Sequence, residues 1–345
     1  MQAYRMVAWK TAPEYQEVPQ PDPRHGQVLV HVGAAGLCHS DLAVIHEMDE
    51  GGFNARVPFT LGHETAGWVE ALGPGATGLE VGEAVAVYGA IGCGTCSRCQ
   101  TGDENICDRA GEMPGTGRGL GVDGGMAPYM VVDRTRQLAP LGDFDPVLAA
   151  PLTCAALSSY RAIRRSLDRL GPGSNAVVIG IGGLGHLAVQ ILRAITPATV
   201  IAVDSKPAAL ALASSLGAHH AVAAGPDAAG AIIGLTAGLG ADATFDLVGS
   251  EATLTLALAT ARTGGRIMLV GAAMGSVSWG LGATKSEVEL STSLWGSIPD
   301  LHDVIALARD GLLEPKVTTF EFDEIPQAIR ALDDGALHGR AVIVL

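Results

Sequence analysis

The sequence is poor in basic residues and lacks both a long uninterrupted apolar segment and a leader-like N-terminus. Its 345 residues include 22 Lys and Arg against 36 Asp and Glu, giving a formal net charge of −14. Nucleic acid requires a basic surface and anionic membranes attract basic segments, so we expect neither as a partner. The longest apolar stretch, residues 176–191, contains four glycines and is shorter than the about 18 residues of a spanning helix.

Residues 1–10 have no apolar core of the kind that secretory leaders carry. We therefore expect a cytoplasmic protein in a reducing compartment, where clustered thiols are metal ligands or catalytic groups more often than disulfide partners. The hydrophobic fraction of 48% supports a sizeable core. The length predicts about two domains at roughly 150 residues each.

Two regions of the chain differ in their secondary-structure pattern. In the first 150 residues, strand-like segments such as 27–32 alternate with Gly- and Pro-rich turns, which predicts an irregular β-rich domain. Farther along, repeated βαβ units predict an α/β fold with a doubly wound parallel sheet, a Rossmann domain. The expected strands are 176–179, 200–203, 244–248 and 266–270, and the expected helices are 158–170, 184–194, 207–216 and 252–261.

Residues 180–185 match the dinucleotide-binding motif G-x-G-x-x-G between a strand and a helix. The glycines allow the backbone to turn tightly and to approach a pyrophosphate at the helix N-terminus. Asp204 ends the next strand, 19 residues after Gly185, where it can accept hydrogen bonds from the adenosine ribose. A plain glycine turn, with Asp204 as a helix cap, is the alternative.

The charge of Asp204 favours NAD over NADP, although Lys206 beside it would suit a 2′-phosphate. His186, which follows the motif, is assigned to packing or to the surface. The predicted cofactor residues of this region are Gly180, Gly182, Gly183, Leu184, Gly185, Asp204 and Lys206.

Four of the six cysteines lie close together in the sequence, at Cys93, Cys96, Cys99 and Cys107. Four thiolates in one short loop fit a closed tetrahedral zinc site, which is structural because no position is left for a substrate. An iron–sulfur cluster is the rival interpretation. The final gap of seven residues differs from the spacing of bacterial ferredoxins, so zinc is favoured.

Cys38, Cys154 and His63 are the remaining candidates for metal ligands. Cys38 follows a strand-like run, and the sequence Gly-His-Glu at 62–64 lies about 25 residues farther on. One or two thiolates, one imidazole and an open position describe a catalytic zinc site. A lone buried cysteine such as Cys154 is more often part of the core than a ligand.

Together, these motifs resemble the zinc-containing medium-chain alcohol dehydrogenases over essentially the whole chain, and most of all bacterial members that act on secondary alcohols and ketones. The matching pieces are G-L-C-H-S-D at 36–41, G-H-E-x2-G-x5-G at 62–73, the four cysteines, the dinucleotide motif and G-R-A-V at 339–342. The resemblance implies a GroES-like catalytic domain at 1–153 and 297–345 and an NAD-binding Rossmann domain at 154–296. It also implies a homo-oligomer, either a tetramer or a dimer.

The resemblance further implies roles for individual residues. It makes Cys38, His63 and Cys154 the ligands of a catalytic zinc, for a total of two zinc ions per chain. Ser40 would relay the proton of the alcohol, Asp41 would orient His63, and Glu64 would lie beside the metal. Helix capping is the alternative for Ser40 and Asp41. The implied cofactor contacts are His39, Val248, Val270, Ala272 and Arg340, and the implied substrate contacts are Phe53, Leu120, Leu294 and Trp295.

The expected reaction is hydride transfer between NAD and an apolar alcohol or ketone. The apolar substrate contacts disfavour a polyol, which needs several placed hydrogen-bonding groups. Polyol, threonine and glutathione-adduct dehydrogenases are the alternatives within the same family. A non-enzymatic NAD-binding scaffold is disfavoured, because Ser40, Asp41 and Glu64 would then have no reason to accompany the ligands.

Overall fold

The computed structural model describes residues 1–49 and 54–345, and these divide into two compact units. The first unit comprises Met1–Leu157, Gly296–Arg309 and Pro315–Leu345. The second comprises Ser158–Trp295 and Asp310–Glu314. Within the described ranges, no helix is both long enough and apolar enough to cross a membrane.

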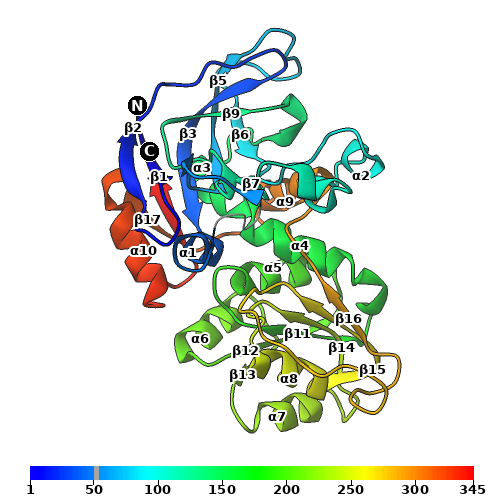
Figure 1. The fold of residues 1–345 in the computed structure, drawn as a ribbon. Coiled ribbons are helices and arrows are strands. Elements are labelled where there is room, and N and C mark those ends of the chain that lie inside the picture. Colours follow the sequence, from blue (N-terminus) through cyan, green and yellow to red (C-terminus); the bar gives the residue numbers. More distant parts are fainter. Residues whose placement is uncertain (50–53) are drawn as a thin grey trace. The chain divides into compact units, whose positions relative to one another are not determined.

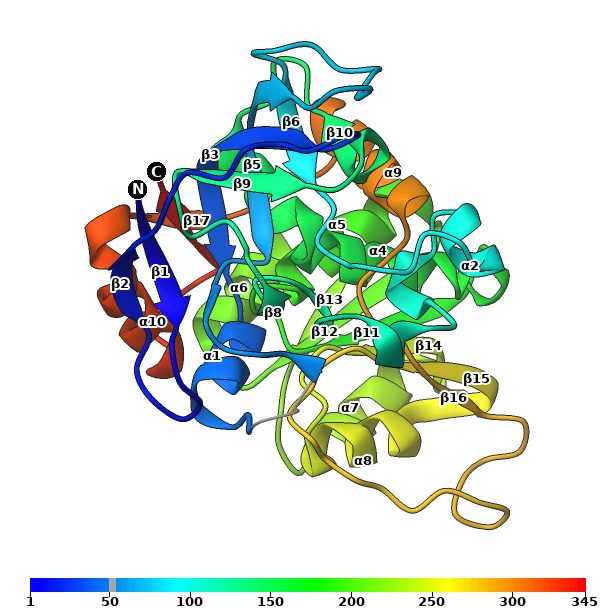
Figure 2. The same ribbon diagram turned by 45° about the horizontal axis from the view of Figure 1, so that its top comes forward.

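The main sheet of the first unit has seven strands in the order β10-β6-β5-β3-β18-β17, with β9 also paired to β3. Most pairs are antiparallel, and Figure 2 shows β3, β5, β6, β9 and β10 side by side. The strands are β3 (Val28–Leu37), β5 (Glu64–Leu72), β6 (Ala84–Val87), β9 (Tyr129–Val132), β10 (Leu138–Pro140), β17 (Val317–Glu321) and β18 (Arg340–Val344). Val28, Val30 and Val32 alternate along β3 and enter one hydrophobic core.

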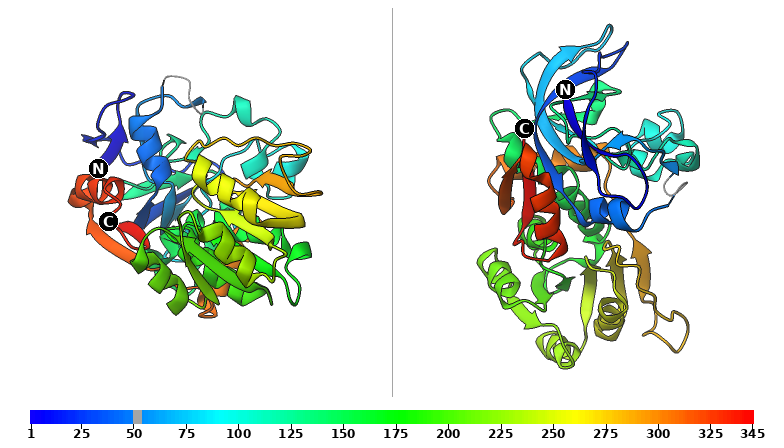
Figure 3. Two further views of the ribbon diagram at one scale, coloured as in Figure 1. Left: turned by 90° about the horizontal axis from the view of Figure 1, so that it is seen from below. Right: turned by 60° about the vertical axis from the view of Figure 1, so that its left-hand side comes forward.

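The C-terminal strand of the first unit lies beside a strand from near the N-terminus (Figure 3). Ala341 of β18 pairs with Leu37 of β3, and Gly36 of β3 pairs with Glu64 of β5. This register brings the first residue of β18, Arg340, to the same end of the sheet as Glu64.

Smaller elements complete the first unit. The other strands are β1 (Gln2–Met6), β2 (Glu14–Glu17), β4 (Phe59–Thr60), β7 (Gly117–Arg118) and β8 (Gly121–Val122). The helices are α1 (His39–His46), α2 (Ser97–Gln100), α3 (Pro146–Ala149), α9 (Ile298–Arg309) and α10 (Ile325–Asp333).

The second unit contains a parallel sheet in the order β13-β12-β11-β14-β15-β16 (Figure 1). This order reverses direction between β11 and β14, as in doubly wound dinucleotide-binding folds. The strands are β11 (Asn175–Ile179), β12 (Thr199–Asp204), β13 (His220–Ala223), β14 (Ala241–Asp246), β15 (Ala261–Leu269) and β16 (Glu289–Thr292). The predicted α/β fold class with a Rossmann-type parallel sheet is confirmed.

Helices cover both faces of the parallel sheet. The pair α5 and α6 packs on one face and the pair α7 and α8 on the other, as right-handed crossovers require. Their bounds are α5 (Gly185–Ile195), α6 (Pro207–Ser215), α7 (Ala228–Leu235) and α8 (Glu251–Thr260). The elements β13, α7 and β16 are not among the sequence expectations, because they are short and partly exposed and so leave a weak periodic pattern.

The single helix expected over 158–170 is wrong in its bounds. Helix α4 spans Ala155–Arg164, and a separate 3-10 turn covers Leu167–Arg169. The buried Ser166 donates its hydroxyl to the carbonyl of Ala162 at 3.1 Å, and its backbone N–H bonds the carbonyl of Ile163 at 2.8 Å. These bonds tighten the chain and end the regular helix.

Candidate active site and metal centres

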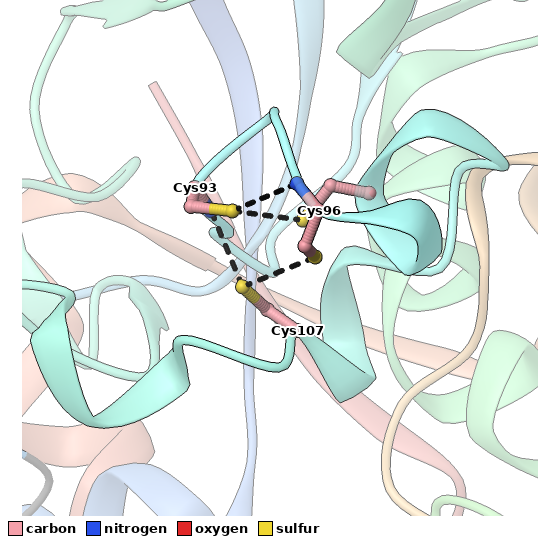
Figure 4. A group of neighbouring side chains, drawn as sticks. Cys93, Cys96 and Cys107 are labelled. Atoms are coloured by element: carbon pink, nitrogen blue, oxygen red, sulfur yellow. Dashed lines mark hydrogen bonds between the residues drawn. The ribbon is translucent and has the colours of Figure 1, made fainter.

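Four thiols converge in the loop around α2, where Figure 4 shows Cys93, Cys96 and Cys107 turned toward one another. The sulfur atoms of Cys93, Cys96, Cys99 and Cys107 all lie within 4.8 Å of one another. Two sulfur–sulfur distances, Cys93 to Cys99 and Cys96 to Cys107, are 3.9 Å. Four ligands at a Zn–S distance of about 2.3 Å form a tetrahedron with edges of about 3.8 Å, so the arrangement fits zinc.

Local hydrogen bonds to the Cys93 sulfur favour its thiolate form, which is the form that binds a cation. The Thr95 hydroxyl donates to the Cys93 sulfur at 3.4 Å, and the Thr95 and Cys96 backbone N–H groups do so at 3.5 and 3.3 Å. These donors lower the pKa of Cys93 to about 5. Burial raises the pKa of Cys99 to about 12. The metal-free loop therefore holds at least one thiolate and one thiol at neutral pH.

A second cluster forms at the end of the main sheet of the first unit. Cys38 follows β3, His63 and Glu64 stand at the start of β5, and Cys154 follows the 3-10 turn Ala150–Thr153. One ligand atom from each of the four lies within 4.8 Å of the others. Two sulfurs, one imidazole and a carboxylate form the donor set of a catalytic zinc.

Both carboxylate oxygens of Asp41 are occupied within this cluster. Oδ2 accepts the backbone N–H of Cys38 at 2.8 Å, and Oδ1 lies 3.1 Å from Nδ1 of His63. Because a carboxylate only accepts, Nδ1 must donate, so Nε2 is the ring nitrogen of His63 that could ligate a metal. Asp41 therefore caps α1 and orients the imidazole at the same time.

The buried cluster has strongly shifted pKa values. Burial lowers the pKa of His63, but the adjacent Asp41 and Cys38 outweigh it and hold the pKa above its ordinary value. A hydrogen bond from Cys154 lowers the pKa of Cys38, and the same bond raises that of Cys154.

Glu64 forms a bidentate ion pair with Arg340, and both side chains are buried. The Nε–Oε2 distance is 2.9 Å, and Nη2 contacts Oε1. Burial raises the pKa of Glu64 despite this partner. A Cβ atom at Gly36 would lie 2.2 Å from Oε2 of Glu64, so only glycine leaves room for the carboxylate. From the sequence we expect Arg340 to contact the cofactor. Nothing in the sequence indicates its ion pair with Glu64.

Ser40 and His39 occupy the first turn of α1. The Ser40 hydroxyl lies 3.7 Å from the sulfur of Cys38 and is partly exposed, so it adjoins the proposed ligand set. His39 is exposed.

The glycine motif of the second unit forms the turn between β11 and α5. Gly180 has φ +90°, and a Cβ there would lie 2.5 Å from Val248; a Cβ at Gly185 would lie 1.9 Å from the carbonyl oxygen of Gly180. A Cβ at Gly182 would meet nothing within 4 Å. Gly182 therefore leaves open space that a cofactor can approach.

Residues far apart in the sequence gather at the carboxyl edge of the parallel sheet. The Asp204 carboxylate accepts the backbone N–H of Ile181 at 2.7 Å and that of Lys206 at 2.8 Å. Val248 follows β14, and Val270 and Ala272 follow the adjacent β15. Ligands of open α/β sheets bind at this edge, where the strand order reverses.

The predicted substrate contacts fall in different parts of the structure. Leu120 is buried in the first unit, whereas Leu294 and Trp295 belong to the second. Trp295 is 4% exposed and has φ +52°, while Leu294 is 58% exposed. Phe53 lies outside the described residues.

His186 is packed inside the second unit, in line with the packing role that its sequence position suggests, and it also contacts the glycine motif. Its ring Nδ1 lies 2.9 Å from the carbonyl oxygen of Gly182, and its side chain is fully buried. A polar residue four positions after a motif glycine is the only sequence signal of this contact.

Comparisons with known proteins agree with this geometry. Residues 24–143 match the family model "Alcohol dehydrogenase GroES-like domain", and residues 183–310 match "Zinc-binding dehydrogenase". An NAD-dependent alcohol dehydrogenase of Sulfurisphaera tokodaii is 35% identical over 100% of both chains. A D-arabinose 1-dehydrogenase (NADP(+)) of Saccharolobus solfataricus is 36% identical over 95% of this chain and 93% of its own. The alcohol dehydrogenase structure from Aeropyrum pernix aligns over 100% of both chains with a TM-score of 0.92 and 34% identity.

Proposed function

The chain belongs to the zinc-containing medium-chain alcohol dehydrogenases, and from this premise we propose that it is an NAD-dependent enzyme interconverting apolar secondary alcohols and ketones. The observation that carries the proposal is the cluster of Cys38, His63, Glu64 and Cys154, with Asp41 orienting His63. Cys38, His63 and Cys154 would hold zinc, which when bound acts as a Lewis acid on the substrate oxygen.

The chain's own residues supply proton handling around this centre. The Ser40 hydroxyl, beside Cys38, is placed to accept the proton of the alcohol and to pass it outward. Asp41 keeps the proton on Nδ1 of His63, so that the ring stays in the tautomer that a metal requires. Glu64, held by Arg340, provides a carboxylate that can exchange into the ligand set.

NAD is the proposed hydride carrier, and Asp204 supports it. The Ile181 and Lys206 backbone bonds hold the carboxylate at the carboxyl edge of the sheet, where its charge disfavours a 2′-phosphate. His39, Val248, Val270, Ala272 and Arg340 remain proposed cofactor contacts. The D-arabinose dehydrogenase among the relatives uses NADP(+), so cofactor preference needs a direct measurement.

The apolar character of Leu120, Leu294 and Trp295 supports an apolar substrate. The sugar-oxidising relative makes a polyhydroxylated substrate the alternative. NADH absorbance recorded over primary alcohols, secondary alcohols, polyols, threonine and aldoses, each with NAD and NADP, tests the proposal. We expect the highest kcat/KM for a secondary alcohol with NAD; a preference for an aldose or polyol would contradict the substrate class.

We also propose two zinc ions per chain, the second held by Cys93, Cys96, Cys99 and Cys107. Metal analysis of the purified protein should give two zinc ions per chain, and Cys38→Ser should give about one with hydride transfer abolished. A single ion in the wild type, or turnover that survives in Cys38→Ser, would contradict the catalytic site. The six unpaired thiols support a reducing, cytoplasmic setting.

A homo-oligomer is the proposed assembly. The segment after β15 exposes three large apolar side chains, with exposed fractions of 85% for Met274, 47% for Trp279 and 107% for Leu281. Exposed apolar groups so close in sequence are typical of an interface. Light scattering after size exclusion should report a dimer or tetramer, and Trp279→Ser with Leu281→Ser should shift it toward the monomer.

A further inference from the structure

We propose that His186 is a positioning residue of the dinucleotide-binding loop, acting through the carbonyl group of Gly182. This inference rests on the proposed NAD-dependent function. The ring Nδ1 lies 2.9 Å from the Gly182 carbonyl oxygen, and the backbone N–H of His186 reaches the same oxygen at 3.2 Å. A carbonyl oxygen can only accept, so Nδ1 carries the proton and donates.

The position of the ring makes this contact a fixed one. His186 is 0% exposed, in the first turn of α5, whereas Gly182 is exposed and lies three residues before the helix begins. The buried imidazole of His186 thus donates a hydrogen bond to a loop residue, Gly182, that is exposed to solvent. The donor cannot exchange readily for water, because the imidazole is enclosed by the protein.

The direction of the held carbonyl determines the direction of the next N–H. In a trans peptide the C=O and N–H groups point in opposite directions. The Gly182 carbonyl accepts both hydrogen bonds from His186, in the first turn of α5, so the N–H of Gly183 points away from that turn. Outward N–H groups at a helix N-terminus are the donors that bind a pyrophosphate.

A second side chain holds the same loop two residues farther on. The Ser159 hydroxyl donates to the carbonyl of Leu184 at 3.3 Å. Two carbonyl groups of the loop are thus held by side chains before any cofactor binds. A loop that is ordered in advance loses less entropy when the cofactor binds. Removing one of these two hydrogen bonds should therefore weaken cofactor binding more than it slows catalysis.

The test is a fluorescence titration of zinc-loaded protein with NADH, accompanied by thermal unfolding without the cofactor. His186→Leu removes the donor and should raise the Kd for NADH by about three- to tenfold, as expected for one lost hydrogen bond. His186→Asn places an amide N–H where Nδ1 stood and should stay within about twofold of the wild type.

Thr196→Val is the matched control. The Thr196 hydroxyl donates to the carbonyl of Leu192, four residues back, at 2.7 Å, so it repeats the same geometry at the other end of α5. This variant should lose stability with no change in the Kd for NADH. In His186→Leu the KM for NADH should rise by a larger factor than kcat falls, which separates a binding effect from a catalytic one.

The outcomes distinguish the inference from the proposed function. Unchanged NADH affinity in His186→Leu would overturn the role of His186. A loss of NADH affinity in His186→Asn and in Thr196→Val as large as that in His186→Leu would overturn it too. If His186→Leu does not fold, His186→Asn and His186→Asp decide, because Asp offers an acceptor where a donor is required. Equal affinity in those two variants overturns the role, and weaker binding by Asp alone supports it. Wild-type protein that binds no NADH would refute the proposed function, and this inference with it.

Discussion

Arg340 and Glu64 form a buried bidentate ion pair although 276 positions separate them in the sequence. Their side chains are 2% and 0% exposed, and Glu64 belongs to the same cluster as Cys38, His63 and Cys154. A charge pair of this kind links the first residue of the last strand to the proposed metal centre.

Arg340→Leu should lower the free energy of unfolding by about 3–5 kcal/mol, because it leaves a buried carboxylate without its partner. The double variant Glu64→Leu with Arg340→Leu should regain part of this loss, since neither charge then remains. Urea denaturation measures both. Arg98→Leu is the control, because its pair with Asp108 is about half exposed and solvent screens such a pair. Equal losses for Arg340→Leu and Arg98→Leu would contradict the buried pair.

Asp41→Ala should weaken zinc binding at the catalytic site by about 10- to 100-fold, because His63 loses the acceptor that fixes its tautomer. It should also destabilise α1 by about 0.5–2 kcal/mol through the lost cap. Competition with a chelator reports the first effect, and chemical unfolding reports the second.

Ser250→Ala separates the two effects of Asp41. The Ser250 hydroxyl accepts the N–H of Thr253 at 3.3 Å and caps α8 in the second unit. This control should lose a comparable stability while its zinc affinity stays unchanged. If Asp41→Ala retains zinc as well as the wild type does, Asp41 serves only as a helix cap.

The affinity of the four-cysteine loop for zinc should rise with pH through the neutral range. The pKa of Cys99 is raised to about 12, so zinc must displace its proton, and that cost falls as the pH increases. The pKa of Cys93 is lowered to about 5, so this thiol is deprotonated above that pH and adds little to the slope.

Thr95→Val should make the affinity more sensitive to acid. Without the Thr95 hydroxyl the pKa of Cys93 should rise, so protons compete at pH 6 but hardly at pH 9. The Thr101→Val control removes a hydroxyl of the same loop that bonds backbone carbonyls and not a thiol. Chelator competition at several pH values should separate the two; identical profiles would show that Thr95 has no part in the ionisation of Cys93.

Asp204→Ser should raise the KM for NAD by about 10- to 100-fold, because charge-assisted hydrogen bonds to the ribose are lost. It should also improve the use of NADP, since the negative charge that repels a 2′-phosphate is gone. Initial rates with both cofactors measure the change. Asp227→Ser is the control, an acid of the same unit whose side chain makes no cap hydrogen bond; any similar effect there would point to net charge alone.

The elements that could be predicted are those with a strong local signal. The βαβ alternation predicted the parallel sheet, because buried strands and amphipathic helices leave periodic patterns. The short elements β13 and β16 were missed, since four-residue strands with exposed positions leave little pattern. The helix expected over 158–170 ends early because the Ser166 hydroxyl bonds the backbone, which periodicity does not register.

The sequence by itself determined the fold class and the four-cysteine loop of this protein, because strand and helix periodicity and short Cys and Gly spacings are local features. Its resemblance to a known family supplied the expected activity and the ligand set of the second metal centre. Only the tertiary structure decided which distant groups meet. It paired Arg340 with Glu64 and brought Asp41 to His63. Strand register and helix packing decide such contacts, and buried polar groups must find a hydrogen-bonding partner wherever the fold places one.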